Sequence, residues 1–255
     1  MIAGRIIPCL LWRGAGLVKT VRYRNPTYVG DPINAVRIFS DKEADELFLV
    51  DIDATRKGYE PRFAEIEDIV SEAFMPIGYC GGVRSVDHAR RLVRLGVEKV
   101  AVNSGALERP GLITEIAAEI GSSSTVGVID VKKPLFGRPA VWSHAGRKVA
   151  LADPVAYAVE LQRLGAGEIL LSAVDRDGMM QGYDLDLVGR IAKAVDVPVV
   201  ALGGAGSVQD LRSALSSGAA GAAAGSLFVF HGTHKAVLIS FPSRREFASL
   251  RAPTG

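Results

Sequence analysis

Two stretches of the chain carry a glycine pair after an apolar run and could hold an anion. In the later stretch, the run Val199 to Leu202 ends in Gly203-Gly204. Ser207 follows as a helix N-cap, and a further run of small residues closes on Gly225-Ser226. Glycines let a backbone approach a ligand closely, and backbone N–H groups beside a helix start attract negative charge. The pattern therefore predicts a βαβ unit with an anion site at its turns.

The earlier stretch repeats this pattern 122 positions before it, without a gap. Gly81-Gly82 aligns with Gly203-Gly204, and Asn103-Ser104 aligns with Gly225-Ser226. A single Gly-Gly pair is usually ordinary turn chemistry, but two related pairs favour a pair of binding sites. The ungapped register indicates that the chain consists of two related halves.

Charged side chains follow several of the predicted strands and could move protons between the two anion sites. Asp51 and Asp130 each end an apolar run, and Asp177-Gly178 follows another. Lys19 lies in the basic, Gly-rich connection 13–32, which is long enough to be a functional lid. Carboxylates in such positions suit general acid–base chemistry on a sugar phosphate. Asp51 and Asp130 could also be plain solvated strand ends.

The histidines give no comparable signal. His88 is expected on a helix face and His144 in a loop without a partner, while His231 and His234 are expected to be solvated. No cluster has metal-ligand spacing, and no Ser or Cys nucleophile has a plausible base. We therefore expect neither a metal nor a cofactor.

The order of the elements predicts the fold. Apolar runs typical of buried parallel strands occupy 5–10, 47–51, 99–103, 125–130 and 168–172, and the two repeated stretches supply the other strands. Helices are expected at 32–44, 62–74, 112–120, 154–164 and 185–195, a hairpin at 132–149, and a last helix in the tail from His231. The prediction is one α/β domain, residues 1–255, folded as a (β/α)₈ TIM barrel with a two-fold half-barrel repeat. An open doubly wound sheet would not explain the repeat.

Charges at the starts of the predicted strands form a second set. Arg5, Glu46, Lys99 and Glu168 stand at or just before strand starts, at the barrel end opposite the expected active site, and Glu98 adjoins Lys99. Ordinary solvated ion pairing is one interpretation. A charged plug over an axial passage is the other.

Composition excludes several classes of protein. The net charge of +2 over 255 residues, with both signs interspersed, gives no surface for nucleic acid or membrane. The only cysteines are Cys9 and Cys80, which fits a reducing compartment better than a disulfide scaffold. We expect a soluble cytoplasmic protein.

The motifs together resemble the cyclase (synthase) subunit of imidazole glycerol phosphate synthase over residues 4 to about 228. The matching segments are Arg5 to Leu10, Gly30 to Pro32, Asp45-Glu46, Gly81-Gly82, Lys99, Asn103-Ser104, Asp130, Ser143-His144, Gly146 to Lys148 and Asp175 to Gly178. The resemblance implies a (β/α)₈ barrel that takes ammonia from a glutaminase subunit docked at its amino-terminal face. It further implies that Arg5, Glu46, Lys99 and Glu168 gate the ammonia, that the glycine turns hold the substrate's two phosphates, and that Lys19 is the lid lysine.

One departure from the family is chemically important. The family uses an aspartate after each of the first and fifth strands; Asp130 matches the second, but Leu11 stands at the first. Leucine cannot transfer a proton, and loss of one acid–base group typically costs about 10² to 10⁴ in rate. The chain is therefore expected to have a changed acceptor chemistry.

Further segments are similar to a branch of second-copy cyclase-like proteins found with surface-polysaccharide genes. These segments are Leu17 to Val21, Tyr28 to Asn34, Asp51 to Thr55, Phe228 to Gly232 and Ala236 to Ser240. The resemblance implies ammonia delivery to an acetamido sugar, as a phosphorylated or nucleotide-sugar acceptor, with a glutaminase-like partner and possibly a third amidotransferase chain.

Three alternatives remain open. The chain could be the histidine-pathway cyclase, with Asp51 replacing the missing acid. It could be a catalytically silent scaffold that activates the glutaminase and passes ammonia on. It could also be a sugar-phosphate isomerase of the related single-chain barrel family, which needs no charged gate.

Overall fold

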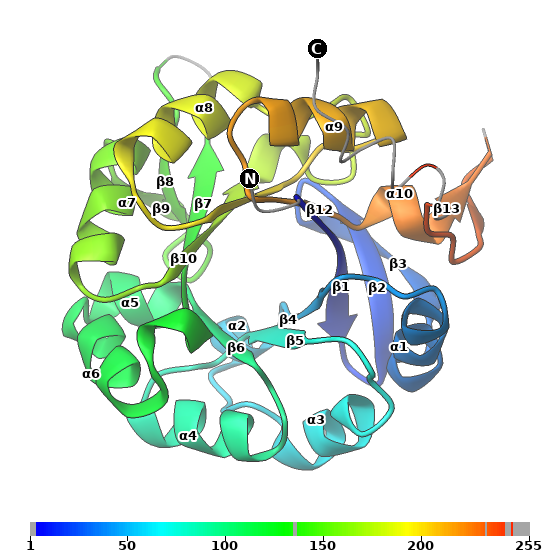
Figure 1. Cartoon of the computed structure of the whole chain (residues 1–255), viewed down its shortest axis with the longest axis horizontal. Helices are drawn as coiled ribbons and strands as arrows, with labels where there is room; N and C mark the ends of the chain where they lie inside the picture. The colour runs from blue at the N-terminus through cyan, green and yellow to red at the C-terminus, as the bar shows by residue number, and fades with distance from the viewer. Residues whose placement is uncertain (1–3, 135–136, 233, 243–245, 247–255) are drawn as a thin grey trace.

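The computed structural model describes residues 4–134, 137–232, 234–242 and 246. Eight parallel strands pair in sequence and close through the β1–β12 and β7–β10 ladders, with helices around them (Figure 1). The barrel strands are β1 (Arg5–Arg13), β4 (Leu47–Asp51), β5 (Ile77–Cys80), β6 (Lys99–Val102), β7 (Thr125–Lys132), β10 (Glu168–Ala173), β11 (Val199–Leu202) and β12 (Gly221–Ala224). The predicted (β/α)₈ barrel is confirmed.

The helices begin where the sequence offers caps. Asp31 and Asp153 cap α1 and α7, each followed by a proline in the first turn. Ser207 caps α9 in a reciprocal capping box with Asp210, as predicted. The helices are α1 (Pro32–Asp41), α2 (Ala54–Lys57), α3 (Phe63–Val70), α4 (Val86–Arg94), α5 (Ser104–Glu108), α6 (Gly111–Ile120), α7 (Pro154–Arg163), α8 (Leu185–Ala194), α9 (Val208–Ser216) and α10 (Ser226–Val229). None of these described helices is long and apolar enough to cross a bilayer.

The repeat is visible in the element bounds. Strand β5, helix α4 and strand β6 correspond to β11, α9 and β12 residue for residue at the 122-position shift. The glycines of the turns correspond as well, since Gly82 and Gly204 both have positive φ, at 69° and 112°. The half-barrel repeat is therefore a property of the backbone as well as of the sequence.

Alternation along the strands divides the core into two layers. On β1, Ile7 and Cys9 join an apolar cluster inside the barrel, while Ile6 and Leu10 pack between barrel and helices. Because side chains alternate across a strand, every second residue must face the barrel axis. The interior cluster contains Ile7, Cys9, Phe48, Ala101, Val126, Val128, Leu170, Val200 and Ala223.

The connection predicted as a lid is an ordered hairpin. Residues 16–30 form β2 (Gly16–Val21) and β3 (Arg24–Gly30), and β2 pairs antiparallel with the end of β1, Leu11 opposite Val18. The sequence prediction ended the first strand at Leu10; the strand continues to Arg13 because β2 supplies its partner. The hairpin is fastened to the residues after β10, where Arg22 N donates to Asp177 O at 2.9 Å.

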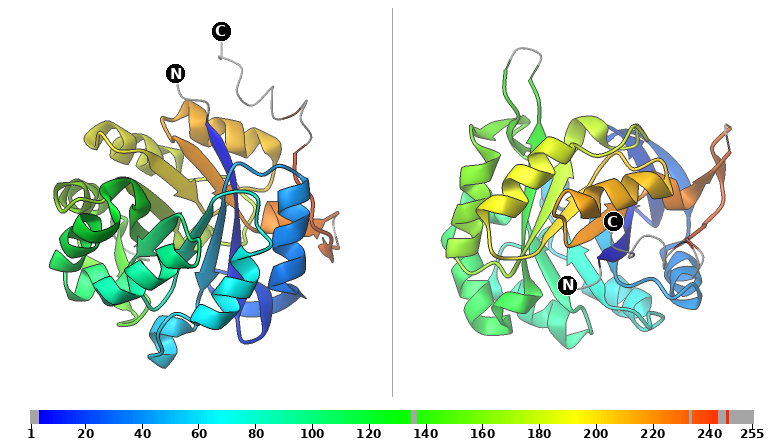
Figure 2. Two further views of the ribbon diagram at one scale, coloured as in Figure 1. Left: turned by 60° about the horizontal axis from the view of Figure 1, so that its bottom comes forward. Right: turned by 45° about the horizontal axis from the view of Figure 1, so that its top comes forward.

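Two further excursions were predicted, and the hairpin at 132–149 is confirmed. The expected hairpin at 132–149 is present as β8 (Ala140–Ser143) and β9 (Lys148–Leu151). In the tail from His231, where a helix is expected, Glu246 is helical, whereas the described residues up to Pro242 are not. There, β13 (Phe230–His231) and β14 (Ala236–Val237) pair outside the ring of helices (Figures 1 and 2), because the chain reverses after Gly232, at a φ of 69°. The rest of that prediction, at 243–245 and 247, lies outside the described residues.

Gly178 offers a test of how firmly the hairpin is held. A Cβ at Gly178 would lie 2.0 Å from Thr20 O in the hairpin, and its φ is 68°. We expect Gly178→Ala to loosen the hairpin by about 2 kcal/mol and to speed hydrogen exchange in residues 16–30 by roughly 30-fold. Gly14→Ala is the matched control, because Gly14 has a φ of 58° and no atom within 4 Å of a built Cβ. Equal exchange in both variants would show that the contact does not hold the hairpin.

Candidate active site

The two halves place Leu11 and Asp130 in equivalent positions at the barrel mouth. Leu11 pairs with Val50, and Asp130 pairs with Ser172, which is 122 positions after Val50. Leu11 is two residues beyond Cys9 of the interior cluster, and Asp130 two beyond Val128, so both point inward. Both are buried, with 3% and 5% of their surface exposed. One side of the mouth thus carries a carboxylate and the equivalent side an alkyl group.

Asp130 has two neighbours that approach the same carboxylate oxygen. Asn103 Nδ2 donates to Asp130 Oδ2, and His144 Nε2 lies 3.4 Å from that oxygen. The His144 ring contacts Tyr23 of the hairpin, with ring centroids 4.7 Å apart. His144 lies in the turn between β8 and β9, as predicted, and the neighbour that the sequence did not identify is Asp130, because the β8–β9 hairpin folds back over the end of β7. This contact has no local sequence signal.

The later glycine turns form a small pocket with the hairpin, which we call the anion pocket. Its lining includes seven of the predicted site residues: Lys19, Asp177, Gly178, Gly203, Gly204, Gly225 and Ser226, together with Leu202, Ala205 and Ala224. Lys19 Nζ donates to Asp177 Oδ1 at 2.7 Å. Ser226 Oγ is buried and finds no hydrogen-bond partner in the described part of the chain. A buried cation, an unpaired hydroxyl and a glycine backbone are suited to an anion.

The earlier glycine turn is built differently. A Cβ at Gly82 would lie 2.7 Å from Tyr59 O, so this glycine is needed for packing against the loop after β4. Asn103, predicted to bind an anion here, directs its side-chain amide to Asp130 instead. Ser104 begins α5 and is half-buried. The two sites predicted from the repeat therefore have similar backbone conformations but different side-chain contacts.

Asp51 is occupied by its own loop. Its carboxylate accepts from Asp53 N at 3.0 Å, Ala54 N at 3.1 Å, Tyr59 Oη at 3.0 Å and Arg62 Nε at 3.1 Å. The Arg62 guanidinium also stacks on Trp12, 3.3 Å from the ring centroid. These contacts hold the β4–α3 connection and engage both oxygens of the Asp51 carboxylate.

At the opposite end, four of the predicted charges form a closed ring, here called the charged ring. Arg5 contacts Glu46 and Glu168, each at 2.5 Å. Lys99 Nζ lies 3.0 Å from the same two carboxylates. Each cation thus bridges both anions across the barrel floor. Glu98, assigned to the same face, is exposed and stands outside the ring.

Burial sets the electrostatics of the charged ring. Burial raises the pKa of Glu46, and although Lys99 and Arg5 oppose this, the pKa stays above its ordinary value of 4.5. Burial lowers the pKa of Arg5, but Glu168 and Glu46 outweigh it, so the pKa of Arg5 is raised. Above the ring, the interior cluster fills the barrel with apolar side chains. The floor is closed in this structure, and passage needs the ring and these side chains to move.

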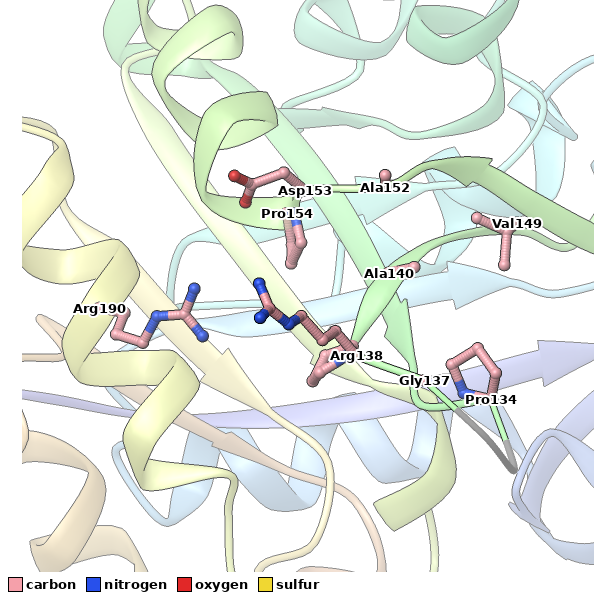
Figure 3. A pocket seen from close by; sticks show the side chains of 10 residues that line it. Pro134, Gly137, Arg138, Ala140, Val149, Ala152, Asp153, Pro154 and Arg190 are labelled. Carbon is pink, nitrogen blue, oxygen red and sulfur yellow. The ribbon is translucent and has the colours of Figure 1, made fainter.

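A larger cavity lies away from the barrel mouth. It has a volume of about 810 Å³ and lies among β8, β9, α7 and α8, where Arg138 and Arg190 face it (Figure 3). None of the predicted site residues lines it. Its walls are largely apolar, and Asp153, the N-cap of α7, adds a carboxylate. The smaller anion pocket, which adjoins the hairpin and the strand ends, is the better candidate for chemistry.

Comparison with known proteins gives one family over most of the chain. The profile of the family described as "Histidine biosynthesis protein" matches residues 5–235. The provisionally named imidazole glycerol phosphate synthase subunit hisF2 of Pseudomonas aeruginosa is 50% identical over 243 residues, 95% of this chain and 97% of that protein. The provisionally named subunit hisF3 of Vibrio vulnificus is 49% identical over 248 residues, 96% and 95% of the two chains. Imidazole glycerol phosphate synthase subunit HisF of Alkaliphilus metalliredigens is 40% identical over 232 residues, 91% and 92%.

Removing one cation should show how far the charged ring stabilises the fold. Lys99→Met leaves two buried carboxylates facing Arg5 alone, and we expect the free energy of unfolding to fall by about 3 kcal/mol near neutral pH. The loss should shrink as the pH falls toward 4.5, because Lys99 holds the pKa of Glu46 down, so that without Lys99 the native state binds a proton at a higher pH and the unpaired charge disappears. Urea denaturation at about pH 7.5 and about pH 5 measures both values.

The control for this variant is Arg37→Met, which breaks the exposed Arg37–Glu72 pair. Its effect should be small and the same at both pH values. A Lys99→Met variant as stable as the control would contradict the assignment of a buried, mutually dependent ring.

Proposed function

The chain belongs to the histidine biosynthesis protein family, and from this premise we propose that it is the synthase subunit of a glutamine amidotransferase complex. In this proposal a glutaminase subunit docks at the amino-terminal barrel face and supplies ammonia through the charged ring. The barrel then adds the ammonia to an acceptor held at the mouth. The observation that carries the proposal is the closed ring of Arg5, Glu46, Lys99 and Glu168 directly beneath the mouth.

The charged ring and the barrel interior suit ammonia as cargo. Neutral ammonia can cross an apolar interior, whereas an ammonium ion would pay the cost of burying an unpaired charge. Small side chains, including Ala101, Ala223 and Cys9, line part of the interior. In this proposal the charged ring lies between the glutaminase and the mouth. It opens for neutral ammonia and excludes ions from the solvent.

The acceptor is proposed to be a phosphorylated or nucleotide sugar with an acetamido group, converted to an acetamidino sugar for a surface polysaccharide. The anion pocket, with Lys19 and Ser226, would hold a phosphate of this acceptor, and Asp130 would be the acid–base group. Leu11 in place of a second carboxylate supports a reaction other than histidine-pathway cyclisation. Relatives designated hisF2 and hisF3 are consistent with second copies. In the same proposal, a third amidotransferase chain can receive the ammonia.

A cytoplasmic location belongs to the same proposal. Glutamine-dependent ammonia transfer needs both subunits and a phosphorylated acceptor in one compartment. Both cysteines, Cys9 and Cys80, are free thiols, in keeping with a reducing compartment.

Histidine-pathway cyclisation is the second candidate, favoured by the 40% identity to a HisF subunit. It needs a second acid–base group at the mouth, and Asp51 is already engaged. A silent scaffold that only activates the glutaminase is the third.

An isotope experiment tests the main proposal. The chain is purified with a co-expressed glutaminase of the HisH type and given [amide-¹⁵N]glutamine and a metabolite extract from cells lacking the gene. We expect ¹⁵N to enter a phosphorylated or nucleotide sugar, and Asp130→Asn to reduce the rate by about 10² to 10⁴. Asp186→Asn, an exposed change on α8, is the control. Failure to use glutamine nitrogen with any acceptor would reject the proposal, and full activity of Asp130→Asn would leave the scaffold.

Complementation separates the two catalytic candidates. We expect the natural chain not to restore growth of a histidine auxotroph lacking the cyclase. Leu11→Asp should restore it, because it returns a carboxylate to the position equivalent to Asp130. Growth with the unaltered chain would favour the histidine-pathway cyclase.

A further inference from the structure

The barrel mouth has one inward carboxylate where the two-fold repeat provides places for two. Leu11 fills the place equivalent to Asp130. We infer that His144 is the second acid–base group of the site, paired with Asp130 and positioned by Tyr23. This inference rests on the proposed addition of ammonia and assigns a role to a residue outside the site predicted from the sequence.

The position of His144 is the first ground for this assignment. Its Nε2 atom lies 3.4 Å from Asp130 Oδ2, yet it is a buried nitrogen without a hydrogen-bond partner among the described residues. The side chain as a whole is 36% exposed, so the ring is in contact both with the carboxylate and with the open side of the mouth. A buried polar atom left unpaired is unfavourable unless something else uses it. Hydrogen bonds of catalytic groups are often long before the substrate binds.

Tyr23 is the second ground, because it fixes the imidazole ring. The two rings meet at an interplanar angle of 55°, and Tyr23 Oη lies 3.0 Å from Ser172 Oγ, on the residue that pairs with Asp130. Tyr23 N donates to Asp177 Oδ2 at 3.0 Å. Burial holds the pKa of Tyr23 well above 10, so its hydroxyl stays neutral. The β2–β3 hairpin therefore keeps the Tyr23 ring in contact with His144, whose Nε2 lies beside Asp130.

The other ionisable groups near the mouth are already engaged. Asp177 accepts from Lys19 Nζ and from Thr20 Oγ1, and Asp51 is held by its own loop. Burial raises the pKa of Cys9 to about 12, so its thiol is not a useful acid at neutral pH. Among the ionisable groups that the structure describes near the mouth, His144 is the one beside Asp130 whose Nε2 atom has no hydrogen-bond partner.

The pair can complete the proton transfers of an ammonia addition. When ammonia attacks a carbonyl carbon, the N–C bond forms and the π-electron pair moves to the carbonyl oxygen. The N–H at His144 Nε2 gives its proton to that oxygen, while the Asp130 carboxylate takes one from the new ammonium nitrogen. Transfer from Asp130 to His144 Nε2 then restores both groups. The net change in the addition is one proton moved from nitrogen to oxygen. Formation of the amidino group then requires the new hydroxyl to leave as water, with one further proton moved from nitrogen to that oxygen by the same pair.

The test uses the same ¹⁵N-glutamine assay, with the chain in complex with its glutaminase and the metabolite extract as acceptor source. We expect His144→Gln and His144→Ala to lower incorporation by about 10² or more, because both remove the proton donor. Added imidazole should restore His144→Ala by at least about tenfold but leave Asp130→Asn unchanged, since imidazole can replace only the missing ring. Tyr23→Phe, which keeps the ring, should retain more activity than Tyr23→Ala.

His231→Gln, a change on β13 away from the mouth, is the control. Co-elution of each variant with the glutaminase shows that it is folded; if His144→Ala fails to fold, His144→Asn takes its place. No incorporation by the natural chain would reject the proposed function itself. Incorporation by the natural chain together with an unimpaired His144→Gln, or the absence of imidazole rescue, would overturn this inference alone.

A measurement that needs no acceptor tests the contact itself. The chain has four histidines, so their imidazole ¹⁵N signals can be resolved. Asp130→Asn should move the His144 signals and leave those of His231 and His234 in place. Unmoved His144 signals would contradict the pairing.

Discussion

The hydrogen-bonded register of the closed strand barrel is the constraint on which the rest of the structure depends. Because all eight strands run parallel, their starts meet at one end and their ends at the other. The register of β1 with β4, and of β7 with β10, brings Leu11 and Asp130 to equivalent places at the mouth. The same ladders bring Arg5, Glu46, Lys99 and Glu168 together at the floor. A shift of one residue in any of these strands would turn the critical side chain toward the helices.

The two halves show how one backbone can carry different chemistry. Gly82 and Gly204 occupy corresponding turns and are both needed for packing, since a Cβ would lie 2.7 Å from Tyr59 O at Gly82 and 2.1 Å from Gly182 O at Gly204, but of the two only Gly204 lines the anion pocket. Asp130 has an aliphatic counterpart in Leu11. The repeat therefore retains the glycine turns that the backbone geometry requires, whereas the side chains at equivalent positions of the mouth differ in chemistry.

The hairpin of β2 and β3 links the two parts of the mouth. Lys19 contributes to the anion pocket, and four residues later Tyr23 packs on His144 beside Asp130. The Asp177 carboxylate accepts hydrogen bonds from Lys19 Nζ, Thr20 Oγ1 and Tyr23 N, so one side chain holds three residues of the β2–β3 hairpin.

The sequence by itself determined the barrel, its repeat and the four members of the charged ring, because these follow from periodicity, glycine placement and the position of residues along strands. It also drew attention to Leu11, where the resemblance to the family implies an aspartate. It did not determine the partner of His144, the engagement of Asp51 or the docked hairpin. Those depend on contacts between residues far apart in the chain, such as His144 with Asp130 and Lys19 with Asp177. Only the folded structure brings such residues together, since no local pattern encodes which strand end a distant loop will cover.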